Sequence, residues 1–155
     1  MEYRHDLHEG TSTFAALVAA LIVVATGLAW AGEGSISVTS VDAMLKQNPL
    51  QAAGPTAKVS GSSQAGNSEL QVIEMSQIKL HHHDQEDHIV YVARGRGILR
   101  MGEKGQETRE VKPGDILNLP RGVPHGFETQ GEENLVLLVV ATAGWKPLED
   151  TKFYE

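Results

Sequence analysis

From residue 68 to residue 142 the chain alternates between short apolar runs and turns that contain glycine or proline. Runs rich in Val, Ile, Leu and Phe between such turns are typical of β-strands. Their number and regular spacing predict an all-β sandwich or barrel of roughly eight strands. The predicted strands are Leu70–Ile78, Lys79–His83, His88–Ala93, Ile98–Met101, Glu107–Val111, Ile116–Leu119, His125–Thr129 and Leu135–Thr142.

Two features of this pattern predict how strands are placed. Leu135–Thr142 is apolar on both of its faces, which indicates a strand covered on both sides. The segment Arg94-Gly95-Arg96-Gly97 predicts a tight turn, after which Ile98–Met101 pairs back on the preceding strand.

The first 31 residues have a different pattern. A polar start is followed by the uncharged run Phe14–Trp30 and by Ala29-Trp30-Ala31, which resembles a signal-peptide cleavage site after Ala31. The polar start carries three acidic residues against Arg4, which is unusual for an export signal, and an uncleaved membrane anchor is the alternative. Either interpretation places the following domain outside the cytoplasm, periplasmic or secreted.

Residues 32–67 predict an N-terminal extension. A short strand is expected at Ser35–Thr39, then a helical turn at Val41–Leu45 capped by Ser40 or Asp42. The Ser- and Gly-rich segment Val59–Asn67 predicts a loop. We therefore expect a leader (1–31), an extension with a loop (32–67), a barrel (68–145) and a polar C-terminal tail (146–155).

Composition excludes several classes of function. The 155 residues include no cysteine, which excludes disulfides, thiolate metal sites and cysteine nucleophiles. Lys and Arg number 13 and Asp and Glu number 20, for a net charge of −7. The chain has no basic patch interleaved with aromatic residues, which argues against nucleic-acid binding.

The candidate functional residues are histidines. His81 and His83 share one face of a strand, because side chains alternate, and His82 points to the other face. His88 begins the next run and shares a face with Val90 and Val92, so two antiparallel strands could bring it to the same place. His125 follows later in the chain. Imidazoles that converge from several strands suit a divalent transition metal.

The spacing of these residues resembles the two motifs of the cupin family. The first, G-x5-H-x-H-x3,4-E-x6-G, corresponds to His81, His83, His88 and Gly95, with Met75 at the leading glycine. The second, G-x5-P-x-G-x2-H-x3-N, corresponds to Gly114, Pro120, Gly122, His125 and, at the final Asn, Thr129. The resemblance implies a double-stranded β-helix, or jelly-roll, barrel over residues 70–142.

The resemblance also implies a ligand set. In the common pattern two His, one Glu and a later His bind the metal, which maps to His81, His83, His88 and His125. His88 stands where the family usually has Glu, so an all-histidine site would favour Fe, Cu, Ni or Zn over Mn. Glu86 is an alternative ligand, and a site without a fourth protein ligand is another.

Three functions remain open for such a barrel, because fold does not fix function. One is a metal-dependent enzyme acting on a small organic molecule, dioxygenase-like, with Glu86 or the metal itself as the general base. The second is a metal-dependent isomerase, lyase or hydrolase. The third is a non-catalytic metal or small-ligand binding module, or an accessory subunit of a larger complex. We expect Val90, Val92 and Phe127 to line a dry pocket with possible contacts from Arg100, Asn118, Arg121 or Glu128, and the resemblance implies a homodimer.

Overall fold

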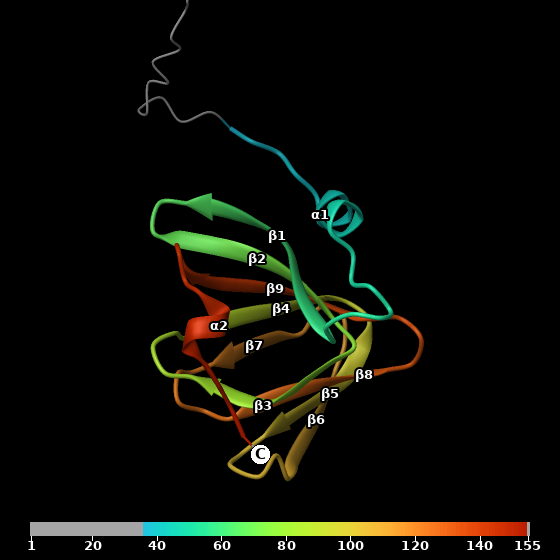
Figure 1. Cartoon of the computed structure of the whole chain (residues 1–155), viewed down its shortest axis with the longest axis vertical. Coiled ribbons are helices and arrows are strands. Elements are labelled where there is room, and N and C mark those ends of the chain that lie inside the picture. The colour runs from blue at the N-terminus through green and yellow to red at the C-terminus, as the bar shows by residue number, and fades with distance from the viewer. Residues whose placement is uncertain (1–35, 155) are drawn as a thin grey trace, which may run out of the picture. The chain divides into compact units, whose positions relative to one another are not determined.

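The computed structural model describes residues 36–154, and the expected signal peptide or anchor lies outside the described residues. Residues 36–154 form two five-stranded sheets that face each other (Figure 1). Within these residues no helix is both long and apolar enough to cross a membrane. The elements in chain order are α1 (Val41–Gln47), β1 (Ala57–Ala65), β2 (Ser68–Met75), β3 (Gln77–His83), β4 (His88–Arg94), β5 (Arg96–Met101), β6 (Glu107–Val111), β7 (Ile116–Leu119), β8 (His125–Gln130), β9 (Leu135–Thr142), α2 (Pro147–Asp150) and β10 (Thr151–Phe153).

The strand order is β1-β2-β9-β4-β7 in one sheet and β10-β3-β8-β5-β6 in the other. Strands that follow one another along the chain therefore often lie in different sheets, as in a double-stranded β-helix. The hydrophobic core lies between the sheets, and alternate residues of the strands supply it. Its buried members are Met75, Val90, Val92, Leu99, Val111, Leu117, Leu119, Phe127, Leu135, Leu137 and Val139.

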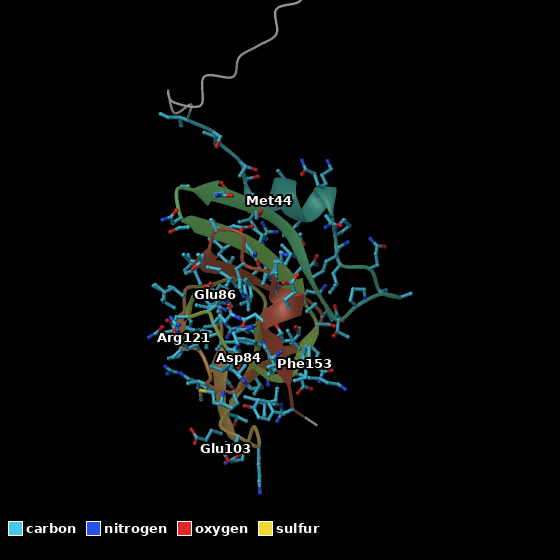
Figure 2. The ribbon with its side chains drawn as sticks, turned by 60° about the vertical axis from the view of Figure 1, so that its left-hand side comes forward. Met44, Asp84, Glu86, Glu103, Arg121 and Phe153 are labelled. Atoms are coloured by element: carbon cyan, nitrogen blue, oxygen red, sulfur yellow. The ribbon has the colours of Figure 1, made fainter. Side chains whose placement is uncertain are left out.

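β9 is the central strand of its sheet, and the prediction that both of its faces are covered holds for its first half, since Val140 and Thr142 on the outer face are exposed. Leu135 and Leu137 face the core, whereas Val136 belongs to a second buried cluster with Met44 and Val72. Met44 projects from α1 (Figure 2). The side-chain oxygen of Ser40 accepts a hydrogen bond from the Ala43 amide, which confirms the predicted N-cap.

Two predictions about the N-terminal extension were wrong. Residues 36–39 form no strand. The segment predicted as a loop forms most of β1, which pairs with β2 from Ala57↔Met75 to Ala65↔Ser68. β1 is an edge strand whose second half is exposed, so backbone hydrogen bonds hold it there and an apolar pattern is not required.

The predicted hairpin at residues 94–97 was also wrong. β4 pairs with β7 and β9, whereas β5 pairs with β6 and β8 in the opposite sheet. Gly95, with φ of 71°, is the point at which the chain crosses between the sheets. A Cβ atom there would collide with the Asn134 carbonyl, so the glycine permits a close crossing of two chain segments.

The polar C-terminal tail is part of the folded domain, contrary to the prediction. Residues 143–153, the C-terminal strap, contain α2 and β10. β10 pairs antiparallel with β3, with Thr151 opposite His83 and Phe153 opposite His81. The strap therefore lies against the strand that carries two of the candidate metal ligands.

Candidate metal centre

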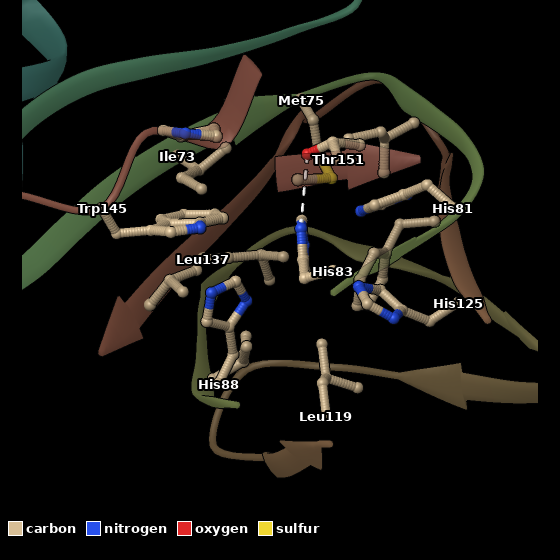
Figure 3. Close-up of a pocket in the computed structure, with 15 residues that line it drawn as sticks. Ile73, Met75, His81, His83, His88, Leu119, His125, Leu137, Trp145 and Thr151 are labelled. Carbon is tan, nitrogen blue, oxygen red and sulfur yellow. Dashed lines mark hydrogen bonds between the residues drawn. The ribbon is translucent and has the colours of Figure 1, made fainter. Parts of the chain in front are cut away.

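Three of the four predicted ligands converge on one point. β3 supplies His81 and His83, and the adjacent strand β8 supplies His125, which lies directly opposite His81. One ligand nitrogen from each of the three rings lies within 4.8 Å of the others. All three side chains are buried and line one pocket (Figure 3).

Each of these three rings has a hydrogen-bonding partner at Nδ1. Nδ1 of His81 donates to the carbonyl oxygen of Lys79 at 2.8 Å, and Nδ1 of His125 donates to the carbonyl oxygen of Val123 at 2.9 Å. Nδ1 of His83 lies 3.3 Å from the Thr151 hydroxyl. A carbonyl accepts only, so it fixes the proton on Nδ1 and leaves the Nε2 lone pair free to bind a metal.

Electrostatics keep these rings neutral near pH 7. Burial lowers the pKa of His83 to about 3, with a further contribution from His88 and the other nearby imidazoles. Burial also lowers the pKa of His125 to about 4, helped by the neighbouring His81. The pKa of His81 is lowered by burial as well. Neutral imidazoles are the form that coordinates metals, so the three residues fit a divalent transition metal.

His88 lies beside this group and is not part of it. The two-strand arrangement predicted for it was wrong, because β3 and β4 belong to opposite sheets. Its ring centroid is 4.6 Å from that of His83 and 4.4 Å from that of Trp145. The ring is buried, and its Nε2 atom has no hydrogen-bonding partner among residues 36–154. His88 as a fourth ligand stays a prediction.

The other predicted polar contacts lie outside the pocket. His82 points away, as expected, and its Nε2 atom is 2.9 Å from the Asp84 carboxylate. The Glu86 carboxylate accepts a hydrogen bond from the Thr142 amide at 3.2 Å and lines a second cavity, not the metal pocket. The remaining predicted contacts are exposed: Arg100 and Glu128 form an ion pair, Arg121 pairs with Asp87, and Asn118 lies on the outer side of β7.

The metal pocket is small, about 80 Å³, and its walls are mostly apolar. Val90 and Phe127 line it as predicted, whereas Val92 is buried in the core away from it. The strap also contributes Trp145, Pro147 and Thr151 to the lining, none of which was predicted as a pocket residue. Pro147 and Thr151 lie in the segment predicted as a tail, and Trp145 is the last residue of the predicted barrel. The pattern of hydrophobic and polar residues did not indicate these three positions, because the strap is short and largely polar.

Comparison with known proteins agrees with this geometry. The family description "Cupin domain" matches residues 70–141. Acireductone dioxygenase of Bacillus cytotoxicus is 33% identical over 76 residues, which are 45% of this chain and 44% of that protein. Acireductone dioxygenase of Bacillus cereus (strain ATCC 14579) is 31% identical over 71 residues, 43% of this chain and 42% of that protein. The chain thus spans less than half the length of these curated relatives.

Solved structures share the fold. The polyketide cyclase RemF from Streptomyces resistomycificus is 32% identical, with a TM-score of 0.50 over 59% of this chain and 63% of that one. A double-stranded β-helix protein from Klebsiella pneumoniae is 21% identical, with a TM-score of 0.56 over 71% of this chain and 92% of that one. Residues 70–141 match the cupin family, carry both histidine motifs and form most of the double-stranded β-helix, so this part of the chain belongs to the cupin superfamily.

Proposed function

We propose that this cupin is a metal-dependent, dioxygenase-like enzyme that acts on a small organic molecule. The main support for the proposal is that three neutral imidazoles converge in a small apolar pocket. In two of them, His81 and His125, a backbone carbonyl binds Nδ1 and fixes the orientation of the ring. A structural metal site would need a closed ligand shell, whereas three protein ligands leave coordination positions free for a substrate.

The chain's own residues have separate roles in this proposal. His81, His83 and His125 would hold the metal, which when bound supplies Lewis acidity and a coordination position for substrate or oxygen. The carbonyls of Lys79 and Val123 keep the proton of His81 and His125 on Nδ1. Val90, Phe127 and the other apolar walls exclude water, which strengthens electrostatic interactions inside the pocket.

The relatives support an oxygen-using reaction, because acireductone dioxygenases of two Bacillus species are 33% and 31% identical to this chain over 76 and 71 residues. RemF supports a second candidate, a metal-dependent cyclase, isomerase or lyase without oxygen consumption. Since the chain covers less than half of the dioxygenases, acireductone itself is one candidate substrate among enediols, β-diketones and phenolics.

Oxygen uptake by the protein loaded with Fe²⁺, Ni²⁺ or Co²⁺ tests the proposal. We expect consumption of O2 with at least one member of a panel of enediols, β-diketones, flavonols and phenolics, and none with the His81→Ala protein. Conversion of a substrate without O2 uptake would favour the cyclase or isomerase alternative. Metal binding without conversion of any panel member would favour a binding module.

Two further proposals concern the setting of the enzyme. The apolar run and the Ala29-Trp30-Ala31 pattern support action outside the cytoplasm, and mass analysis of protein from the native host would show cleavage after Ala31.

Exposed apolar side chains on the outer face of β4, β7 and β9 support a homodimer, which sedimentation can test. These side chains are Ile89, Tyr91, Ile116 and Val140.

A further inference from the structure

Two cavities meet at the indole of Trp145. The metal pocket has a volume of about 80 Å³, and a second, outer cavity has a volume of about 340 Å³. Trp145 is the one residue among 36–154 that lines both. The outer cavity is polar, unlike the metal pocket, and its lining includes Gln85, Glu86, Lys146, Glu149 and Asp150.

A buried carboxylate holds the indole in this position. Nε1–H of Trp145 donates to Asp150 at 3.0 Å, and the same carboxylate accepts the backbone amides of Asp84 at 3.1 Å and Gln85 at 3.0 Å. Asp150 is only 6% exposed. The carboxylate therefore fastens the strap to the turn between β3 and β4 and fixes the indole as a wall.

The indole packs at a right angle against His83, one of the candidate metal ligands. The Trp145 and His83 ring centroids are 5.0 Å apart, at an interplanar angle of 90°. Figure 3 shows Trp145 on the same side of the pocket as His88. Movement or truncation of this one side chain would open the metal pocket toward the outer cavity.

The volumes of the two cavities indicate that a substrate occupies both. Pockets that enclose small molecules usually measure about 300–1,000 Å³. The metal pocket alone is well below this range, whereas the outer cavity is within it. A molecule of the usual size that reaches the three histidines would therefore leave part of its volume on the other side of the indole.

Resting on the function proposed above, we propose that Trp145 is a specificity-determining residue that divides one substrate cleft into an inner metal chamber and an outer polar chamber. The matching substrate is an elongated molecule. Its narrow reactive end passes the indole, and a neutral or cationic hydrogen-bonding end remains outside. The charge preference follows from the outer chamber, where Glu86, Glu149 and Asp150 outnumber Lys146.

Fluorine NMR binding measurements on metal-free protein test the division of the cleft. The probes are 4-fluorophenol, with one ring, and 6-fluoro-2-naphthol, with two. For each protein we compare the affinity for the two-ring probe with the affinity for the one-ring probe. We expect this ratio to be about tenfold or more higher in Trp145→Ala than in the wild type, and intermediate in Trp145→Phe. Phe153→Ala is the matched control, because this strap aromatic lines neither cavity.

An unchanged preference between the two probes in Trp145→Ala, or no binding of either probe to any protein, would overturn the inference. Tighter binding of 4-fluorobenzoate than of 4-fluorobenzylamine would overturn the charge preference. Trp145→Phe keeps an aromatic ring in the wall, so a graded result can be obtained even if Trp145→Ala does not fold. The proposed metal site is tested separately, by titration with Co²⁺. Because the probes are measured on metal-free protein, a failure to bind Co²⁺ would contradict the metal site without affecting the test of size selectivity.

Discussion

Thr151 lies opposite His83 in the pairing of β10 with β3, and its hydroxyl oxygen is 3.3 Å from Nδ1 of His83. The other two candidate ligands take their Nδ1 partners from nearby backbone carbonyls, at Lys79 and Val123. His83 instead depends on a residue 68 positions away. The C-terminal strap therefore completes the metal site that the two histidine motifs begin.

Thr151→Val should weaken metal binding. The valine keeps the shape of the side chain but removes the partner that orients His83, and loss of such an outer partner lowers metal affinity roughly 10–100-fold. Isothermal titration with Co²⁺ or Zn²⁺ checks this. Thr151→Ser is the matched control, because it keeps the hydroxyl and should bind nearly as well as the wild type. Equal affinity of the Val and Ser proteins would contradict the prediction.

His81→Ala should remove most of the metal, because it deletes one of three converging ligands. The loss should exceed the roughly 10–100-fold effect of removing an outer partner. His82→Ala is the control, since that neighbouring side chain points away and contacts Asp84. Metal content after purification measures the effect. Near-normal metal content in His81→Ala would contradict the assignment of the metal site.

The metal-free protein should lose stability as the pH falls below 6.5. Burial lowers the pKa of His83 to about 3 and of His125 to about 4 from 6.5. Between pH 6.5 and these values the unfolded chain takes up protons that the folded chain does not, so acid favours unfolding. Each such histidine can contribute up to about 1.4 kcal/mol per pH unit.

Urea unfolding at pH 7.0, 6.0 and 5.0 measures this dependence. The window lies above the range in which surface carboxylates such as Asp87, whose pKa Arg121 lowers to about 2, become protonated. His125→Gln should reduce the slope, because the glutamine amide does not titrate. A free energy of unfolding that stays constant from pH 7 to pH 5 would show that the buried rings titrate normally.

Much of the fold could be predicted because its strands carry local signals. β4, β7 and β9 have apolar residues at the spacing that a packed sheet requires, and three of the histidines matched to the cupin motifs, His81, His83 and His125, do come together in the structure. Alternation along β3 was enough to separate His83 from His82.

The features that were missed depend on partners distant in sequence. β1 is largely polar and forms because β2 pairs with it from Ala57 to Ala65, with one irregularity between Val59 and Gly61. Gly95 resembles a hairpin glycine, and only the close crossing at Asn134 shows that it joins two sheets. Trp145 and Asp150 gain their roles from contacts with His83 and with the turn at Asp84, which no spacing within the strap reveals.

His88→Ala is the change that separates a three-histidine site from a four-histidine site. Its ligand nitrogens lie outside the converging group, since β4 belongs to the other sheet, and the ring packs against Trp145 of the strap. We therefore expect His88→Ala to retain Co²⁺ with an affinity within about tenfold of the wild type, less than the cost of losing a ligand. The visible spectrum of bound Co²⁺, which reports coordination number, should not change. His88→Glu, which restores the acidic residue of the motif, should likewise leave the preference between Mn²⁺ and Co²⁺ unaltered. If His88→Ala loses metal as fully as His81→Ala, or if His88→Glu shifts the preference toward Mn²⁺, the ring moves inward to bind the ion, and the four-histidine set that the motif spacing predicts is the correct one.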